Sequence, residues 1–119
     1  MTISQLLNKL PLEHLTRSLP QDILFNSVYA CDLLSQVLAK AGQNDLWITV
    51  QTHGTILGIA SIKQIPCILF TEGLRPEQAV IDKAEQEGIF LLASQLTTFQ
   101  IGGQLYKLLL EEESNINNE

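Results

Sequence analysis

The sequence is poor in cysteine and in positive charge. Cys31 and Cys67 are its two cysteines among 119 residues, too few for a disulfide framework, and we expect both to be small core residues of a cytoplasmic protein. Lysine and arginine number 7 against 13 aspartates and glutamates, which gives a formal net charge of −6. The chain therefore does not fit a protein that binds nucleic acid or an anionic membrane surface through clustered basic side chains.

Long apolar runs and the common nucleotide motifs are missing as well. No stretch reaches the roughly 18 apolar residues of a membrane span, and residues 1–5 have neither the basic start nor the apolar run of a signal peptide. The patterns G-x-x-x-x-G-K-[ST] and G-x-G-x-x-G are absent, and the two histidines and two cysteines form no close pair of the kind that binds zinc. We therefore predict neither a metal nor a resident cofactor.

No catalytic constellation is evident either. Cys31 stands just before an expected helix start, a position that can make a thiol reactive, but a nucleophile needs a base beside it and none is apparent. An enzyme that uses His53 with Asp32 or Glu72 is the least supported interpretation, since nothing in the sequence places these groups within hydrogen-bond reach. We predict no catalytic residue and no enzymatic activity.

What the sequence does contain is 45% hydrophobic residues, arranged in short periodic segments. Thr2-x-x-Gln5 and Thr97-x-x-Gln100 are capping boxes that each open a helix. Asp32 is expected to cap the helix over 33–41, and Gly42 is expected to end it. Gly88 is expected to end the helix over 76–87. Helices are expected over 2–10, 33–41 (apolar stripe Leu33, Leu34, Val37 and Leu38), 54–63, 76–87 and from 97 to beyond 109, strands over 12–16, 23–30, 46–50, 66–70 and 89–92, and a turn at Pro20 and Asp22.

The order of these segments predicts the fold. From residue 46 onward strands and helices alternate with short connections, which indicates a parallel sheet with right-handed crossovers. Residues 67–70 and 89–92 are apolar throughout, as in strands that are buried on both faces. We therefore expect a three-layer α/β fold, a mostly parallel β-sheet flanked by helices. It forms one domain over 1–111, and 112–119 are expected to be a disordered acidic tail.

Polar loops mark a candidate site. In an open parallel sheet, ligands bind beyond the carboxyl ends of the strands, where loops 51–54, 71–75 and 93–97 should meet, joined by 30–32. The alternative is that threonine, serine and aspartate merely cap helices there. His53 could serve as an acid, a base or an anion contact, or it could be a loop histidine bonded to backbone. The candidate ligand-binding residues are Asp32, Thr49, Thr52, His53, Thr71, Glu72, Gly73, Arg75 and Ser94.

Gly102-Gly103 lies inside the last helical segment. Glycines there cost roughly 1 kcal/mol each relative to alanine, which suggests close packing against a neighbour, within the chain or in another subunit.

Four segments of the chain resemble the DRTGG domain family, which is similar to the N-terminal domain of HPr kinase/phosphorylase. They are YACDLLS (29–35), GQNDLWITVQTH (42–53), ILFTEG (68–73) and EGI (87–89). Their order and spacing extend the resemblance over about residues 1–110. It implies a three-layer α/β domain with a mostly parallel sheet. The kinase domain of HPr kinase, with its phosphate loop, has no counterpart here.

The resemblance also implies a function. DRTGG units accompany paired CBS domains in regulatory pyrophosphatases and precede phosphate acetyltransferase regions, where they look like regulatory or dimer-forming modules, sometimes near adenine nucleotides. We therefore expect a non-catalytic, ligand-sensing homodimer that binds an adenine nucleotide or another small metabolite at the strand ends. The alternative is a protein–protein interaction module, whose partner is another protein and which takes no small-molecule ligand.

The sequence departs from the family pattern at two places. The family's Asp-Arg appears as Asp45-Leu46, and its Thr-Gly-Gly as Thr71-Glu72-Gly73. The resemblance therefore implies the loss of one phosphate contact and the gain of a negative charge, for which Arg75 would compensate in part.

Overall fold

The computed structural model describes residues 1–17 and 23–117, with side chains as far as residue 115. The turn expected at Pro20 and Asp22 lies outside these residues. Within them, every expected helix and strand has a counterpart, and no helix is both long and apolar enough to cross a membrane.

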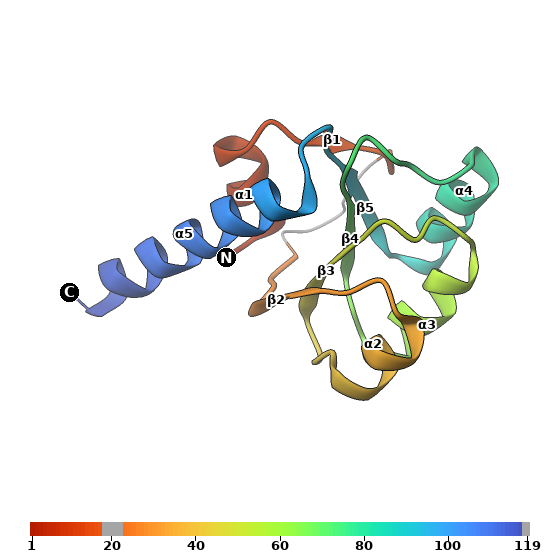
Figure 1. Ribbon diagram of the computed structural model, residues 1–119, viewed down its shortest axis with the longest axis horizontal. Helices are drawn as coiled ribbons and strands as arrows, with labels where there is room; N and C mark the ends of the chain where they lie inside the picture. Colours follow the sequence, from red (N-terminus) through yellow and green to blue (C-terminus); the bar gives the residue numbers. More distant parts are fainter. Residues whose placement is uncertain (18–22, 118–119) are drawn as a thin grey trace.

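A five-stranded sheet forms the middle layer (Figure 1). Its order is β1-β5-β4-β3-β2. The four strands β2 to β5 are parallel, and β1 pairs with β5 in the antiparallel sense, with Glu13 opposite Ala93. The expected mostly parallel sheet is thus confirmed. The strands are β1 (Glu13–His14), β2 (Ser27–Ala30), β3 (Asp45–Thr49), β4 (Cys67–Phe70) and β5 (Phe90–Ala93).

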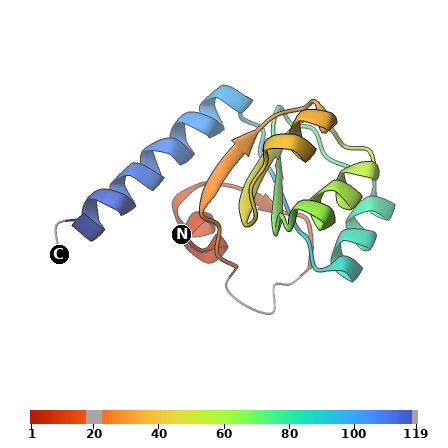
Figure 2. The same ribbon diagram turned by 90° about the horizontal axis from the view of Figure 1, so that it is seen from below.

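Helices cover both faces of the sheet (Figures 1 and 2). The chain steps in one direction from β2 to β5, so right-handed crossovers place the three connecting helices on the same face. These are α2 (Leu34–Lys40), α3 (Thr55–Lys63) and α4 (Gln78–Glu87). The opposite face carries α1 (Ile3–Lys9) and α5 (Thr98–Asn117). This is the expected three-layer α/β architecture.

Alternation along the strands divides the core into two clusters. In β3, Trp47 packs toward α2 and α3, whereas Leu46 and Ile48 pack toward α1 and α5. Successive strand side chains point to opposite faces, and β4 and β5 are buried at every position. Burial on both faces explains why these strands read as continuous apolar runs.

Local capping signals are confirmed in the first and last helices. Thr2 and Gln5 form the predicted reciprocal capping box at α1. At α5, the Gln100 amide donates to Thr97 Oγ1 at 3.1 Å and the Thr97 amide donates to Gln100 Oε1 at 2.9 Å. Gly88 takes the predicted left-handed conformation after α4, with φ of 74°.

The predictions for α2 were wrong in three details. Asp32 does not cap this helix, because its carboxylate bonds to β3 and the residue after it. Gly42 is not left-handed; Asn44 takes the positive φ (65°). Instead, the Gly42 amide donates to the Asp45 carboxylate at 2.6 Å. In the expected apolar stripe, Val37 is buried, but Leu33 and Leu38 are exposed.

Element boundaries differ elsewhere as well. β2 occupies only the second half of the expected strand 23–30, and α4 begins at Gln78, after Pro76 rather than with it. The largest difference lies at the end of the chain. α5 continues to Asn117, so the segment expected to be a disordered tail is helical as far as the structure describes it.

Candidate functional site

The nine candidate residues lie at the carboxyl edge of the sheet, and seven of them fall into three groups with different surroundings; Gly73 and Ser94 line a separate small pocket. One group ties β2 to β3, a second holds the start of α5, and a third lines a groove between α3 and α4. The first two are engaged with the protein itself, whereas the third faces open space.

Asp32 and Thr49 belong to the first group. Asp32 Oδ1 accepts hydrogen bonds from Thr49 Oγ1 at 2.9 Å and from the Val50 amide at 2.8 Å. The Gln51 side-chain amide donates to the Asp32 carbonyl at 2.9 Å. Charge-assisted bonds of this kind are among the stronger ones. Asp32 therefore fixes the loop that follows β3, which is a structural role.

Thr71 and Glu72 belong to the second group. The Thr71 hydroxyl lies 2.6 Å from that of Thr98, and Glu72 Oε2 accepts from the Thr98 amide at 2.7 Å. A carboxylate at this end of a helix satisfies a free N–H and interacts favourably with the helix dipole. Glu72 thus anchors the start of α5, so its negative charge does not face the groove described next.

The third group is Thr52, His53 and Arg75. These residues line a groove of about 440 Å³ together with Gly54, Glu77 and Val80. The groove lies where the amino ends of α3 and α4 approach each other: a Cβ atom at Gly54 would stand 3.8 Å from Val80. Within the described residues, neither N-cap residue, Gly54 or Glu77, bonds its helix through its side chain.

The electrostatics of this groove favour an anion. The amino end of a helix carries partial positive charge on its free N–H groups, and two such ends converge here. Arg75 lines the groove and brings a guanidinium whose planar donors suit a phosphate or carboxylate, although Glu13 pairs with it at 2.9 Å. Glu77 opposes this effect in part.

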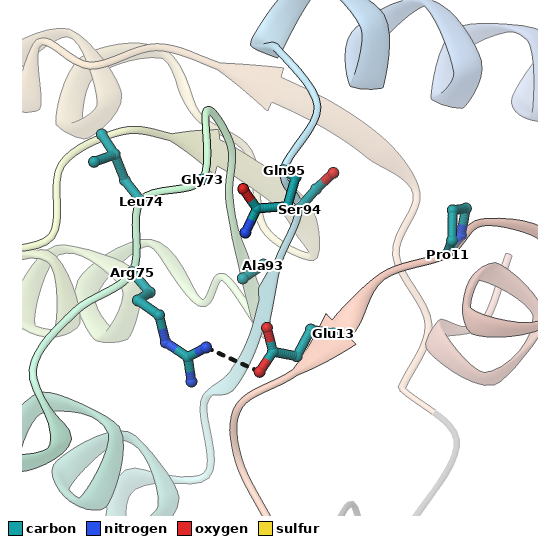
Figure 3. A pocket seen from close by; sticks show the side chains of 8 residues that line it. All are labelled: Pro11, Glu13, Gly73, Leu74, Arg75, Ala93, Ser94 and Gln95. Carbon is teal, nitrogen blue, oxygen red and sulfur yellow. Dashed lines mark hydrogen bonds and ion pairs between the residues drawn. The ribbon is translucent and has the colours of Figure 1, made fainter.

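Arg75 also lines a second, smaller pocket of about 90 Å³ with Gly73 and Ser94 (Figure 3). There its Nη1 donates to Glu13 Oε1 of β1 at 2.9 Å. The two side chains are 51% and 57% exposed, so water screens the pair and its contribution to stability is small. Arg75 thus stands between the two pockets.

His53 sits at the rim of the larger groove. The Thr55 amide lies 3.4 Å from its Nδ1, which fits the alternative of a loop histidine bonded to backbone. Its ring is otherwise exposed. The hydrogen bonds of the Asp32 and Glu72 carboxylates go to Thr49, Val50 and Thr98, not to His53.

The cysteines are dissimilar. Cys67 is fully buried, and burial raises the pKa of its thiol far above the usual range. Cys31 is partly exposed, and its Sγ contacts the Leu33 carbonyl oxygen at 3.7 Å. Among the described residues, no three His, Cys, Asp or Glu side chains are grouped so as to hold a metal ion.

The departures from the family pattern lie at opposite ends of the sheet. Asp45 begins β3 and Leu46 is fully buried, whereas Thr71 follows the carboxyl end of β4. An arginine in place of Leu46 would enter the core and not the groove. The implied loss of a phosphate contact at this position is therefore wrong.

Sequence reasoning missed Glu13, Glu77, Val80 and Thr98. Glu13 reaches the site through an antiparallel edge strand of two residues, whose place in the sheet no local signal indicates. Glu77 could have been found, because it follows Pro76 in the first turn of the helix expected over 76–87, where side chains face a ligand at the strand ends.

Three comparisons with known proteins bear on this geometry. A family model described as HPr Serine kinase N terminus matches residues 51–109. No curated protein matches the sequence. Among solved structures, the chain is similar to the CBS and DRTGG domains of the regulatory region of Clostridium perfringens pyrophosphatase, complexed with its activator diadenosine tetraphosphate.

That similarity has a TM-score of 0.67 at 14% sequence identity, and it covers 83% of this chain. It spans 43% of the pyrophosphatase chain, so the likeness concerns one part of that regulatory region. The matched segment 51–109 contains both helices that border the groove. Fold and family match agree: the chain has a DRTGG-like fold, and residues 51–109 are similar to the N-terminal domain of HPr serine kinase.

Proposed function

We propose that this domain is a non-catalytic regulatory module that senses a small anionic metabolite, with adenine nucleotides as the first candidates, and that it works as a homodimer. The observation that supports ligand binding is the groove between the amino ends of α3 and α4, which Arg75 helps to line. Asp32, Thr49, Thr71 and Glu72 support the groove by fixing the loops around it.

The choice of ligand class follows from the donors. Backbone amides at two helix ends bind phosphate without a dedicated loop, and Thr52 and His53 add side-chain donors at the rim. The related pyrophosphatase region was solved with a diadenosine polyphosphate as activator, which supports testing adenine nucleotides first. Binding without turnover is the simplest use of this groove.

A calorimetric titration of ATP, diadenosine tetraphosphate and adenosine into the protein tests this proposal. We expect the two phosphate-bearing ligands to bind and adenosine to bind far more weakly. Loss of a charged hydrogen bond costs about 1.5–3 kcal/mol, so Arg75→Gln should weaken binding roughly tenfold to a hundredfold. Arg17→Gln, which changes the other arginine of the chain, should leave the affinity unchanged.

Equal affinity of Arg75→Gln and the parent protein would contradict the proposed groove. Hydrolysis of a ligand at a rate that depends on His53 would contradict the non-catalytic role. If a broad thermal-shift screen of nucleotides and common metabolites is flat, the alternative of a protein–protein interaction module is favoured, because a ligand at 100 times its Kd should stabilise the fold by about 2.7 kcal/mol.

A further inference from the structure

α5 carries apolar side chains on two faces, but the sheet covers one of them. Ile101 and Leu105 are fully buried against the sheet. Phe99, Tyr106 and Leu110 are 88%, 67% and 48% exposed. With Gly103 between them, these positions are spaced by four, three and four residues and so share one side of the helix. We call Phe99, Gly103, Tyr106 and Leu110 the outer stripe of α5.

The outer stripe contains a hollow between two projections. A Cβ atom at Gly102 or Gly103 would meet no atom within 4 Å, so the close packing that we considered for these glycines does not occur within the described chain. The aromatic rings of Phe99 and Tyr106 stand on either side. Figure 2 shows that α5 runs out beyond the sheet.

A groove of about 470 Å³ continues the outer stripe toward the sheet. It lies between α5 and the edge strand β2, and its walls include Val28, Ala30, Tyr106 and Leu109, with the buried Ile48 among its lining residues. Among the described residues, β2 ends the sheet and has no strand on its outer side. Contiguous apolar surface of this kind marks an interaction site.

We infer that a second copy of this chain covers the outer stripe, with the two α5 helices crossing antiparallel at Gly102-Gly103. An isologous contact needs one patch that supplies both projections and hollows. Phe99 and Tyr106 are equally far along the helix from a twofold axis between residues 102 and 103. Such an axis therefore places Phe99 of each copy opposite Tyr106 of the other. The glycines let the helix backbones approach.

Charge selects the antiparallel arrangement. Glu111, Glu112 and Glu113 follow the outer stripe. Glu112 pairs with the Met1 ammonium group at 3.1 Å, but Glu111 and Glu113 would repel their counterparts if two helices ran parallel. In the antiparallel crossing these acidic segments lie roughly 28 Å apart along the helix axes, well beyond the Debye length of about 8–10 Å.

The exposed side chains of the outer stripe supply part of the area that a dimer needs. Two largely exposed aromatic side chains can bury on the order of 150 Å² each. Leu110 and the adjoining groove add to this, toward the roughly 800 Å² that each partner buries in a stable interface. The inference deepens the homodimer of the proposed function and rests on it, but it does not depend on the identity of the ligand.

Light scattering and sedimentation of the full chain test the interface. The parent protein should have twice the 13.2 kDa mass of the chain. Gly103→Arg places a long side chain at the crossing and should weaken the dimer at least tenfold, as should Phe99→Ser. Gly58→Arg in α3 is the matched control, because Gly58 is also helical, exposed and without neighbours within 4 Å, and it should leave the dimer intact.

Disulfide trapping tests the orientation. In a Cys31→Ser background, Gly103→Cys should form a covalent dimer on mild oxidation, whereas Glu113→Cys should not. Circular dichroism establishes that each variant is folded. A folded parent protein of 13.2 kDa at 100 µM would overturn the inference and leave the outer stripe to a different polypeptide. A dimer that Gly103→Arg and Phe99→Ser leave unchanged would also overturn it, while nucleotide binding and the groove would be unaffected.

Discussion

At the scale of single residues, Glu72 combines a strained backbone with a side chain that holds the start of α5. Its φ is 64°, in the left-handed region that costs a non-glycine residue roughly 1–2 kcal/mol, and its carboxylate holds the Thr98 amide. Glu72→Ala loses the bond and keeps the strain, whereas Glu72→Gly loses both. We expect Glu72→Gly to be more stable than Glu72→Ala by about 1 kcal/mol in urea unfolding.

The reverse order would contradict this account of Glu72. Gly58 supplies the control: it lies within α3 and is not left-handed, so Gly58→Ala should be the more stable form there, as it is in most helices.

The buried thiol of Cys67 makes the stability of the fold depend on pH. Burial raises the pKa of Cys67 in the folded state above its ordinary value of 9.0. Below pH 9 both states carry a neutral thiol, and the full stability is present. As the pH rises further, the unfolded thiol ionises and the folded one does not. The free energy of unfolding therefore falls by roughly 1.4 kcal/mol per pH unit from this group.

Urea unfolding at pH 8 and pH 10 measures this contribution. The difference in unfolding free energy between the parent protein and Cys67→Ala should shrink by about 1 kcal/mol at the higher pH. Cys31→Ala, which removes a partly exposed thiol, is the matched control. A constant difference for Cys67→Ala would contradict the burial of its thiol in the folded state.

The residue types at the sheet edge were predictable from the sequence, but their roles were not. Polar residues after each strand indicated the right loops, because strand ends and helix starts have local signals. Whether Asp32 caps its own helix or bonds to Thr49 depends on the neighbouring strand, 17 residues away. Such contacts are set by tertiary packing, which local patterns do not record.

At the scale of elements, local sequence signals predicted helix ends correctly where the two residues of a contact lie close together in the sequence. The boxes at Thr2 and Thr97 and the cap at Gly88 involve residues three or four positions apart and were predicted. The prediction of a left-handed Gly42 after α2 was wrong, because the Gly42 amide bonds to the Asp45 carboxylate and Asn44 takes the positive φ instead. The length of α5 was underestimated because its last turns bury little surface.

β1 controls Arg75 through one ion pair. Glu13→Gln removes the charge that holds the guanidinium on the β1 side. Exposed pairs contribute roughly 0.5–1 kcal/mol, so freeing Arg75 should tighten phosphate binding in the groove about two- to fivefold, with little change in stability. Calorimetric titration with ATP measures the shift.

Glu87→Gln is the matched control for Glu13→Gln. Glu87 is an exposed acid at the far end of α4, so the variant has the same net charge and should bind as the parent protein does. Unchanged affinity for Glu13→Gln, or an equal gain for both variants, would argue against a specific role of the Glu13–Arg75 pair.

At the scale of the whole molecule, one topological feature creates the candidate site. Because the chain steps in one direction from β2 to β5, α2, α3 and α4 lie side by side on one face, and the amino ends of α3 and α4 meet beside Arg75. The alternation of strands and helices predicted this arrangement. The antiparallel addition of β1, which brings Glu13 to Arg75, was not predictable from a segment of two residues.

The central claim is that an anion binds between the amino ends of α3 and α4. A titration of ATP into isotope-labelled protein, followed by amide chemical shifts in NMR, tests it most directly. We predict that the largest shifts fall on residues 52–56 and 77–80 and on Arg75, and that Arg75→Gln moves them to roughly tenfold to a hundredfold higher ATP concentration. Shifts centred on the Asp32–Gln51 network or spread over the surface, with the helix ends unchanged, would contradict the account.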